Sequence, residues 1–541
     1  MKYNIIFGAL VYIIYMVTEG LDVYAVEALV LLSICVFVPS ILTLVDSKMR
    51  NGRMFSVFKI LILSYPIAVI SAALAFVTNM PVFASIWFGY TIMVGYFGVH
   101  RLIQRGIRPL QEFAIDIGLL YLVLGGFWFY AYIANIQVMH FTSIIVLLTA
   151  IHFHYSALLI PIFTGFLGRK FHTSSNLYTY TAWSVIVSPM TIAVGITYSR
   201  VFEFIAVLAY MFGLYMYSIM VLRTPFQRNV AKVLVSISAL VLIFTISLSL
   251  LYAYGRAMHQ VTISIDAMIF FHGLMNTIGV VTPAIIGWFL EGTKPRYVHY
   301  GKPCSRITGT SRVGTSFLSR RNLLSSDAYD GLVDDMRIYK SAHLLSPTIT
   351  DFYERTETYS LQARVQWSTW FKPLGMVYEQ TSKYIGQIYL KDTGRWEEMY
   401  GKIVGIRSAA DGRDNVRAWL RSNEKGEAIF IALYAQHTFQ GETYMNVALP
   451  LPFSNMTGIL RLYNDEQRLI LTSRLRTDGQ GDEGTYLYIK YMTVRLPIDE
   501  TFVVIAEDDM RLSAQHDMHI CGIRFLTVNY RIMKNKEAEY K

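Results

Sequence analysis

Three histidines and one asparagine stand inside long apolar segments of the sequence, where ionisable side chains are uncommon. His152 and His154 lie near the middle of residues 139–168, and His272 and Asn276 lie four residues apart in a later segment. A polar side chain inside a membrane is costly and usually faces protein, water or a ligand. A neutral imidazole offers one donor and one acceptor nitrogen, and it binds transition metals well. These four residues are therefore the candidate site.

Three roles fit these side chains. The side chains could bind haem or a transition metal, they could belong to a proton relay or a solute site, or their hydrogen bonds could fix the helices together. Successive helical residues turn by about 100°, so His152 and His154 point to nearly opposite faces and cannot hold one metal ion together. His272 and Asn276 share a face. If both helices start at the membrane boundary, His272 lies about 8 Å nearer the outer surface than His152. A tilt or a shift of a few residues would bring them level, so a cluster of either earlier histidine with this pair is geometrically allowed.

Carboxylates stand at or near the ends of several apolar segments, on the side opposite the basic loops. They could form an acidic vestibule that gathers cations, or they could simply be tolerated at hydrated helix ends. Asp116, near the start of another segment, allows the same two interpretations. The candidates for the vestibule are Glu19, Asp22, Glu27, Glu203 and Asp266.

Apolar segments fill the first half of the chain. With 54% hydrophobic and 16% charged residues in 541, and a mean hydropathy of +0.38, the chain is too apolar for an ordinary soluble protein. A membrane-crossing helix takes about 20 residues, and about ten segments fit this hydropathy criterion, of which the first is the shortest. They are residues 5–17, 26–45, 55–77, 82–99, 114–134, 139–167, 178–198, 202–222, 231–254 and 265–290.

Basic residues are concentrated in alternate loops between these segments. The positive-inside rule assigns such loops to the cytoplasm, and an even number of crossings brings both ends of the membrane half to that side. We therefore expect both termini to be cytoplasmic. The basic residues are Lys48, Arg50, Arg53, Arg101, Arg105, Arg108, Arg169, Lys170, Arg223, Arg228, Lys232, Lys294 and Arg296.

Several function classes lack support in the sequence. The net charge of +10 is spread over short loops, which does not suit nucleic-acid binding. The three cysteines form no CxxC pair, so a disulfide framework is not expected. No P-loop, GxSxG, HExxH or GxGxxG motif occurs, so an enzyme is the less favoured class, and the oligomeric state is left open.

The second half of the chain has a different composition. The composition shifts to Ser, Arg, Gly and Thr at residues 302–327, which suggests a mobile juxtamembrane linker of residues 293–346 after a transmembrane domain of residues 1–292. Residues 347–541 alternate with a period of two and predict a mainly β cytoplasmic domain, an antiparallel barrel or curved sheet with one helix near 370–384. Such a sheet could enclose a lipid or other apolar ligand, or it could be a filled module that binds a partner.

The sequence also resembles two known families. The run IHFHYSALLIPIFTGF resembles the helix of haem-copper oxidase subunit I in which an HFH run ligates two haems, although that family's paired copper-site histidines are not seen. More broadly, HFHYSALLIP, HGLMNTIG, FYERTETYSLQARVQWSTWFKPL and HICGIRFLTVNYRI together resemble the YndJ-like family of bacterial membrane proteins. This second resemblance implies a polytopic protein of the bacterial inner membrane, commonly described as a transporter, with no established substrate.

From these observations, the expected function is transport of a small or lipidic solute, with His152, His154, His272 and Asn276 at the site. The first alternative is a redox or sensor protein in which those histidines bind haem or a metal. The second is a lipid-binding scaffold anchored in the bilayer.

Overall fold

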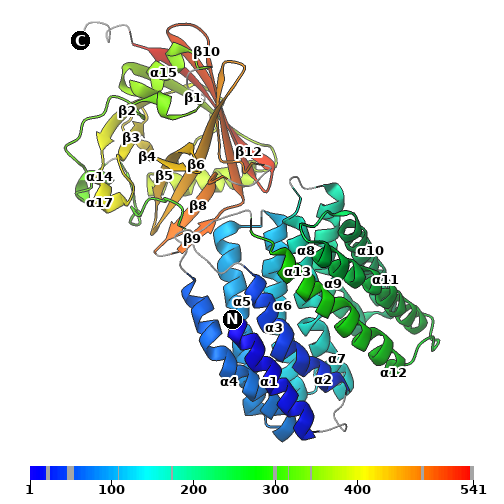
Figure 1. Ribbon diagram of the computed structural model, residues 1–541. Coiled ribbons are helices and arrows are strands. Elements are labelled where there is room, and N and C mark those ends of the chain that lie inside the picture. Colours follow the sequence, from blue (N-terminus) through cyan, green and yellow to red (C-terminus); the bar gives the residue numbers. More distant parts are fainter. Residues whose placement is uncertain are drawn as a thin grey trace. The chain divides into compact units, whose positions relative to one another are not determined.

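The computed structural model divides the chain into two compact units, Met1–Val298 and His299–Lys541, which are described separately (Figure 1). The first unit is a bundle of helices and the second is built around a β-sheet. The structure describes residues 1–19, 25–45, 54–107, 109–139, 141–171, 175–295, 301–314, 316–340, 344–476, 481–490 and 492–535.

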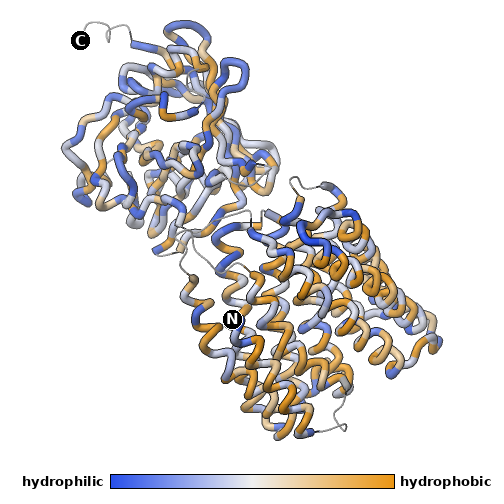
Figure 2. The backbone as a smooth tube through the Cα atoms, viewed as in Figure 1, coloured by the Kyte–Doolittle hydropathy of each residue, from blue (hydrophilic) through white to orange (hydrophobic). Residues whose placement is uncertain are grey.

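Long helices make up the membrane unit, and apolar residues dominate along their middles (Figure 2). They are α1 (Lys2–Glu19), α2 (Ala25–Leu32), α3 (Val38–Leu44), α4 (Ser56–Thr78), α5 (Pro81–Arg105), α6 (Leu110–Ile133), α7 (Ser143–His154), α8 (Ser156–Gly168), α9 (Asn176–Tyr198), α10 (Arg200–Arg223), α11 (Asn229–Ala257), α12 (Ile265–Ala267) and α13 (Thr282–Glu291). Three π-helical stretches join some of them: η2 (Ser33–Phe37), η3 (Met268–Leu274) and η4 (Asn276–Val281).

Nine helices within the described ranges are long and apolar enough to cross a membrane. The first expected segment, which forms α1, is not among them. It has only 18 residues, and Lys2, Asn4 and Glu19 reduce its hydropathy. Nine crossings would put the two ends of the bundle on opposite sides and ten would put them on the same side. The orientation predicted from the loops therefore depends on α1.

Three of the crossing helices depart from regular α-helical geometry. The crossing at 26–44 contains η2, and the last contains η3 and η4 in succession. The crossing at 143–168 is interrupted at Tyr155, whose φ of −110° and ψ of −86° lie outside the helical region. This break follows His154 directly and lies N-terminal to Pro161, which stays inside α8. Local departures of this kind are often found at functional sites.

Ten strands of the second unit form a closed antiparallel barrel, as the sequence predicts. The ring order is β5-β4-β3-β2-β1-β12-β11-β10-β7-β6, and β6 pairs again with β5. The remaining two strands form a hairpin that extends from β6. The strands are β1 (Tyr359–Trp367), β2 (Glu397–Gly405), β3 (Arg417–Ser422), β4 (Ala428–Phe439), β5 (Glu442–Leu451), β6 (Ser454–Asp465), β7 (Arg468–Thr472), β8 (Gly484–Ile489), β9 (Met492–Arg495), β10 (Ile498–Ala506), β11 (Arg511–Ile520) and β12 (Ile523–Lys534).

Alternate residues of each strand fill the barrel interior. On β1, Leu361, Ala363, Val365 and Trp367 are all buried, and they face β12 residues of the same buried cluster. This period of two follows from the pleat, which sends successive side chains to opposite faces of a sheet. The expected helix is present as α16 (Lys372–Ile385), with three shorter ones, α14 (Phe317–Arg320), α15 (Pro347–Glu354) and α17 (Ser408–Asp411).

The described parts of residues 301–340 lie against the barrel, which differs from the mobile linker that their composition suggests. Ile307, Val313 and Phe317 are buried in a cluster with outward-facing residues of β3 and β4. Lys302 forms a buried ion pair with Asp482. Apolar residues spaced along a polar stretch thus cover the outer face of the sheet, and the compact unit begins at His299.

The cysteines should differ sharply in reactivity. Cys521 is exposed, whereas Cys35 and Cys304 are buried. Burial raises the pKa of the Cys304 thiol to about 12, and only the thiolate reacts with disulfide reagents. Ellman's reagent at pH 7.5 should therefore titrate one thiol in the native protein and three after denaturation. A second thiol reacting rapidly in the native protein would contradict the burial of Cys304 or Cys35.

Candidate functional site

His272 and Asn276 lie together in the π-helical part of the last crossing helix and face α11. The imidazole Nδ1 lies 2.9 Å from the Thr245 carbonyl oxygen and 3.1 Å from the Ser249 hydroxyl. The Asn276 amide nitrogen lies 3.2 Å from Nε2, and its carbonyl oxygen accepts a 2.6 Å hydrogen bond from the Thr245 hydroxyl. This arrangement suits a neutral imidazole that donates from Nδ1 and accepts at Nε2. Both side chains are half-buried.

His152 faces the same part of the bundle. Its side chain is exposed in the protein chain, with Nδ1 2.5 Å from the Leu148 carbonyl oxygen. It interacts electrostatically with His272, and no hydrogen bond joins the two imidazoles. Of the residues that the sequence proposes as a cluster, His272 and Asn276 are in hydrogen-bond contact, and His152 is linked to them only by its electrostatic interaction with His272.

His154 points elsewhere, as its position two residues after His152 predicts. It is fully buried, and its Nε2 accepts a 3.1 Å hydrogen bond from the indole nitrogen of Trp87 on α5. Its Nδ1 lies 2.9 Å from the Ala150 carbonyl oxygen. The ring packs closely against Gly125 of α6, where an added Cβ would lie 2.9 Å from Nδ1. Both nitrogens therefore have protein partners, which is the geometry of a residue that joins helices.

The break at Tyr155 ties the irregular helices together. The Tyr155 hydroxyl donates to the Leu29 carbonyl oxygen at 2.7 Å and lies beside Thr277 of η4. Ser33, the first residue of η2, donates to the His154 carbonyl oxygen at 3.1 Å. The three departures from α-helical geometry thus meet around one tyrosine.

The acidic candidates lie in different surroundings. Glu27 accepts a 2.7 Å hydrogen bond from the Tyr132 hydroxyl. Glu203 is buried, 3.6 Å from Arg256. Glu19 and Asp266 are exposed, and Asp22 lies outside the described residues. The acidic vestibule stays a prediction.

A buried ion network, which the sequence did not predict, surrounds Glu112. This carboxylate accepts hydrogen bonds from Arg101 (3.1 Å), Arg105 (2.6 Å) and Arg169 (2.6 Å), which come from α5 and from the end of α8. Asp116 also binds Arg101 and Arg105, at 2.6 Å and 3.0 Å. All five side chains are at most 4% exposed. Asp116 is therefore part of a network and not only a tolerated helix-end charge.

A second ion pair lies at the same end of the bundle. Glu291 of α13 binds Lys170 and accepts from the backbone N–H of Gln227 at 3.0 Å, just before α11. Arg169 also donates to the Thr293 carbonyl oxygen at 3.3 Å. Four of the basic residues used to predict orientation, Arg101, Arg105, Arg169 and Lys170, thus have structural partners. The only signal for this in the sequence was the presence of Glu112, Asp116 and Glu291 beside the basic loops.

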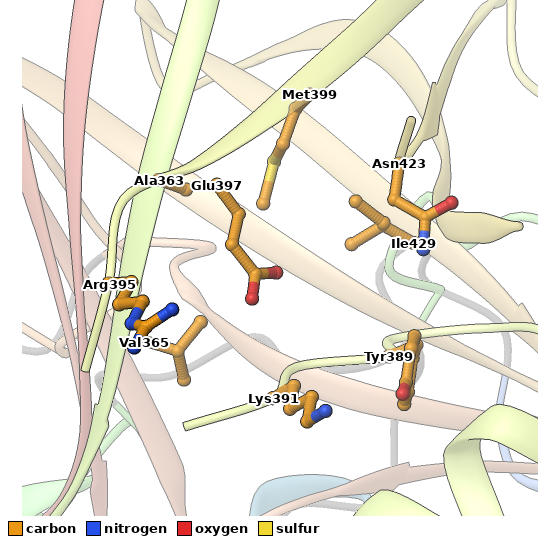
Figure 3. Close-up of a pocket in the computed structure, with 9 residues that line it drawn as sticks. All are labelled: Ala363, Val365, Tyr389, Lys391, Arg395, Glu397, Met399, Asn423 and Ile429. Atoms are coloured by element: carbon orange, nitrogen blue, oxygen red, sulfur yellow. The ribbon is translucent and has the colours of Figure 1, made fainter. Parts of the chain in front are cut away.

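In the second unit, the interior of the barrel is largely filled. Trp367, Trp419, Tyr434 and Tyr530 are all buried there. A pocket with an empty volume of about 360 Å³, which includes open solvent, lies where β1 and β2 meet two loops. In Figure 3 the Glu397 side chain stands in the middle of the hollow. The lining residues are Ala363, Val365, Tyr389, Lys391, Arg395, Glu397, Met399, Asn423 and Ile429.

Within the described residues, no group of three or more His, Cys, Asp or Glu side chains is placed to hold a metal ion. Of the three histidines named as metal candidates, His152 and His272 interact electrostatically, and His154 is bonded separately to Trp87 and Ala150.

Comparison with known proteins supports the family resemblance. A sequence model described as YndJ-like protein matches residues 28–280, which include all four candidate site residues. The "Uncharacterized membrane protein YndJ" of Bacillus subtilis (strain 168) is 45% identical over 538 residues, which cover 98% of each chain. No solved structure matches. The chain therefore belongs to the YndJ-like family of membrane proteins.

Proposed function

We propose that the protein transports a small polar solute or ion across the bacterial cytoplasmic membrane, with His272 and Asn276 in its binding site. The observation that carries the proposal is the π-helical stretch formed by η3 and η4, which presents both side chains toward α11. π-helical turns are rare and occur often at functional sites. Many transporters bind their substrates where crossing helices are interrupted.

The chemistry of the cluster suits a ligand that both donates and accepts hydrogen bonds. His272 and Asn276 supply both kinds of group, and Ser249 adds a hydroxyl. His152 brings a second imidazole that is exposed in the chain. An imidazole can take up a proton at one nitrogen and release one from the other, so two histidines also suit coupling of solute movement to a proton. His154 is assigned a structural role, since both of its nitrogens are bonded within the bundle.

The other functions have less support. A haem or metal centre would have to rely on His152 and His272, because His154 is already engaged and no third metal-binding side chain joins them in the described residues. A lipid-binding scaffold would need space in the barrel, whose interior positions carry large buried side chains. We assign the barrel to the cytoplasmic side, as the basic loops predict, and regard it as a filled module.

Reconstituted full-length protein can test the transport proposal. Proteoliposomes on a solid-supported membrane would be given concentration jumps of amino acids, sugars, organic acids, inorganic cations, phosphate and protons, and the resulting charge movement recorded. We expect at least one jump to give a current that empty liposomes lack. His272→Ala should lower that current at least tenfold, because it removes the central imidazole.

His154→Gln is the matched control, since it changes a buried intramembrane histidine outside the proposed site. It should retain most of the current in the protein that folds. The proposal fails if no jump gives a current with the wild-type protein, or if His272→Ala, monodisperse after purification, transports as well as wild type.

A further inference from the structure

Among the buried polar groups of the membrane unit that lack a hydrogen-bond partner, six belong to α8, α9, α10 and α13. They are the side-chain hydroxyls of Thr164, Thr181, Tyr210, Tyr217 and Ser218 and the indole N–H of Trp288. Each side chain is at most 6% exposed. Buried polar groups in proteins are nearly always paired, with protein or with ordered water, and the membrane core makes an unpaired group costlier.

The threonine and serine hydroxyls are exceptions within their own bundle. Many hydroxyls in these helices bond back to the carbonyl four residues earlier, as Thr149 does at 2.7 Å and Thr197 at 2.8 Å. Such a bond satisfies the hydroxyl inside its own helix. Thr164, Thr181 and Ser218 make none. Their hydroxyls are therefore left for a partner outside the helix.

The packing of α9 on α10 places three of these groups at one level. A Cβ built on Gly213 would lie 2.3 Å from the Ser184 hydroxyl, and one on Gly195 would lie 2.5 Å from the Glu203 Cα. The two helices are antiparallel, so residue numbers rise along one helix where they fall along the other. The two numbers of any facing pair therefore add to nearly the same total as in these two pairs. Thr181 therefore lies opposite Tyr217 and Ser218.

Other contacts join α8 and α13 to this level. The Tyr178 hydroxyl, one turn from Thr181, donates to the Thr164 carbonyl oxygen at 3.3 Å. The Tyr217 hydroxyl lies beside the Trp288 indole N–H, but the two groups do not have the geometry of a hydrogen bond. The Trp288 ring lies 5.9 Å from that of Phe166, which is two residues from Thr164.

The series of polar groups continues toward the candidate site in one direction and toward the ion network around Glu112 in the other. Tyr210 is two turns from Tyr217 on the same face of α10, and its hydroxyl lies beside Ser156, which donates to the His152 carbonyl oxygen at 3.1 Å. In the other direction, Tyr178 interacts electrostatically with Glu112 and Arg169 of the ion network. The polar groups thus form a track from the candidate site to one end of the bundle.

We infer that this track is a hydrated pathway through the bundle, in which water or a small hydrogen-bonding solute supplies the partners that the six groups lack. The inference rests on the proposed transport function, because it gives the binding site at His152 and His272 a route to the end of the bundle that carries Glu112 and Arg169. The solute that fits this pathway is small, neutral or singly charged, and able to form hydrogen bonds.

Cysteine accessibility tests the pathway in the full-length protein. Thr181→Cys and Ser218→Cys would be placed singly in a Cys521→Ser background, which removes the exposed thiol. Thr91→Cys is the matched control, because Thr91 is also fully buried but its hydroxyl is bonded to the Phe88 carbonyl oxygen at 2.7 Å. Labelling by a small charged methanethiosulfonate would be followed by intact mass.

We expect both track cysteines to be labelled at least tenfold faster than Thr91→Cys, because the reagent needs water and a thiolate. Equal rates at all three positions, slow or fast, would overturn the pathway. The labelling would be repeated with His272→Ala in the same chain. If the His272→Ala chain loses the current but its track cysteines are still labelled, the pathway is upheld. If the chain without His272→Ala transports but its track cysteines are not labelled, the pathway is refuted and the proposed transport function is not.

Discussion

Replacing Glu112 by glutamine should destabilise the membrane unit more than any other single charge change in it. Glu112 accepts hydrogen bonds from three buried arginines on two other segments, so its loss leaves guanidinium groups in a low-dielectric site with one carboxylate fewer. Breaking a buried ion pair by removing one partner costs about 3–5 kcal/mol. The apparent melting temperature of the detergent-solubilised protein should fall by roughly 10 °C.

The exposed carboxylate of Glu19 is the control for this experiment. Glu19→Gln makes the same chemical change at the end of α1, where the side chain is open to solvent or headgroups. It should shift the melting temperature by less than about 2 °C, because surface charges contribute little to stability. Similar melting temperatures for Glu112→Gln and Glu19→Gln would show that the buried network does not hold the three segments together.

Gly118→Val should also prevent stable packing of the bundle. A Cβ at Gly118 would lie 2.6 Å from the Leu158 carbonyl oxygen of α8, and this backbone atom cannot move without shifting the helix. Overpacking of this kind costs about 1–3 kcal/mol, and more where backbone must shift. Small residues at helix interfaces allow close approach in membranes. We expect a clear loss of monodisperse protein in size-exclusion chromatography.

Gly89→Val separates this steric effect from helix propensity. Gly89 lies within α5, another crossing helix, and a Cβ there would meet no atom within 4 Å. The two substitutions carry the same intrinsic helix cost, so the difference between them reports the contact between α6 and α8. Equal yields of monodisperse protein from the two variants would count against the close approach of these helices.

The crossing helices could be predicted from the sequence because their signal is local. Residues 55–77 are apolar throughout, and α4 spans Ser56–Thr78. The π-helical stretches could not, because a widened turn depends on what the neighbouring helix offers. Nothing in the run MIFFHGL distinguishes it from an ordinary helix until Thr245 and Ser249 of α11 are placed beside it.

In the second unit, the sequence predicts the strands in which apolar and polar residues alternate strongly, and it does not indicate the strands with weaker alternation. The predicted strand 359–367 coincides with β1, whereas β2, with the sequence EEMYGKIVG, contains two glycines and exposed charges that hide its pattern. The polar composition of segment 301–340 predicts a linker, and this prediction is wrong for its described residues, which lie against the barrel. Only its scattered apolar residues, such as Ile307 and Phe317, indicated that it would lie against a sheet.

Part of the candidate site can be predicted from the sequence. The pairing of His272 with Asn276 followed from their spacing, and the divergence of His152 from His154 followed from helical geometry. The electrostatic interaction of His152 with His272 depends on the tertiary structure, since the two residues lie on helices far apart in the chain. The ion network around Glu112 cannot be predicted from the sequence for the same reason, because its arginines have the positions of ordinary loop charges.

The pairing of the first barrel strand with the last has a consequence for biosynthesis. β1 and β12 face each other along nine residue pairs, from Tyr359 with Lys534 to Trp367 with Leu526. Translation proceeds from the N-terminus, so the helices of the membrane unit are synthesised first. One edge of β1 then stays unpaired until β12 has emerged from the ribosome. During that interval the nascent chain exposes the kind of strand edge that recruits chaperones or other nascent chains. A stop codon that removed β12 would make that state permanent.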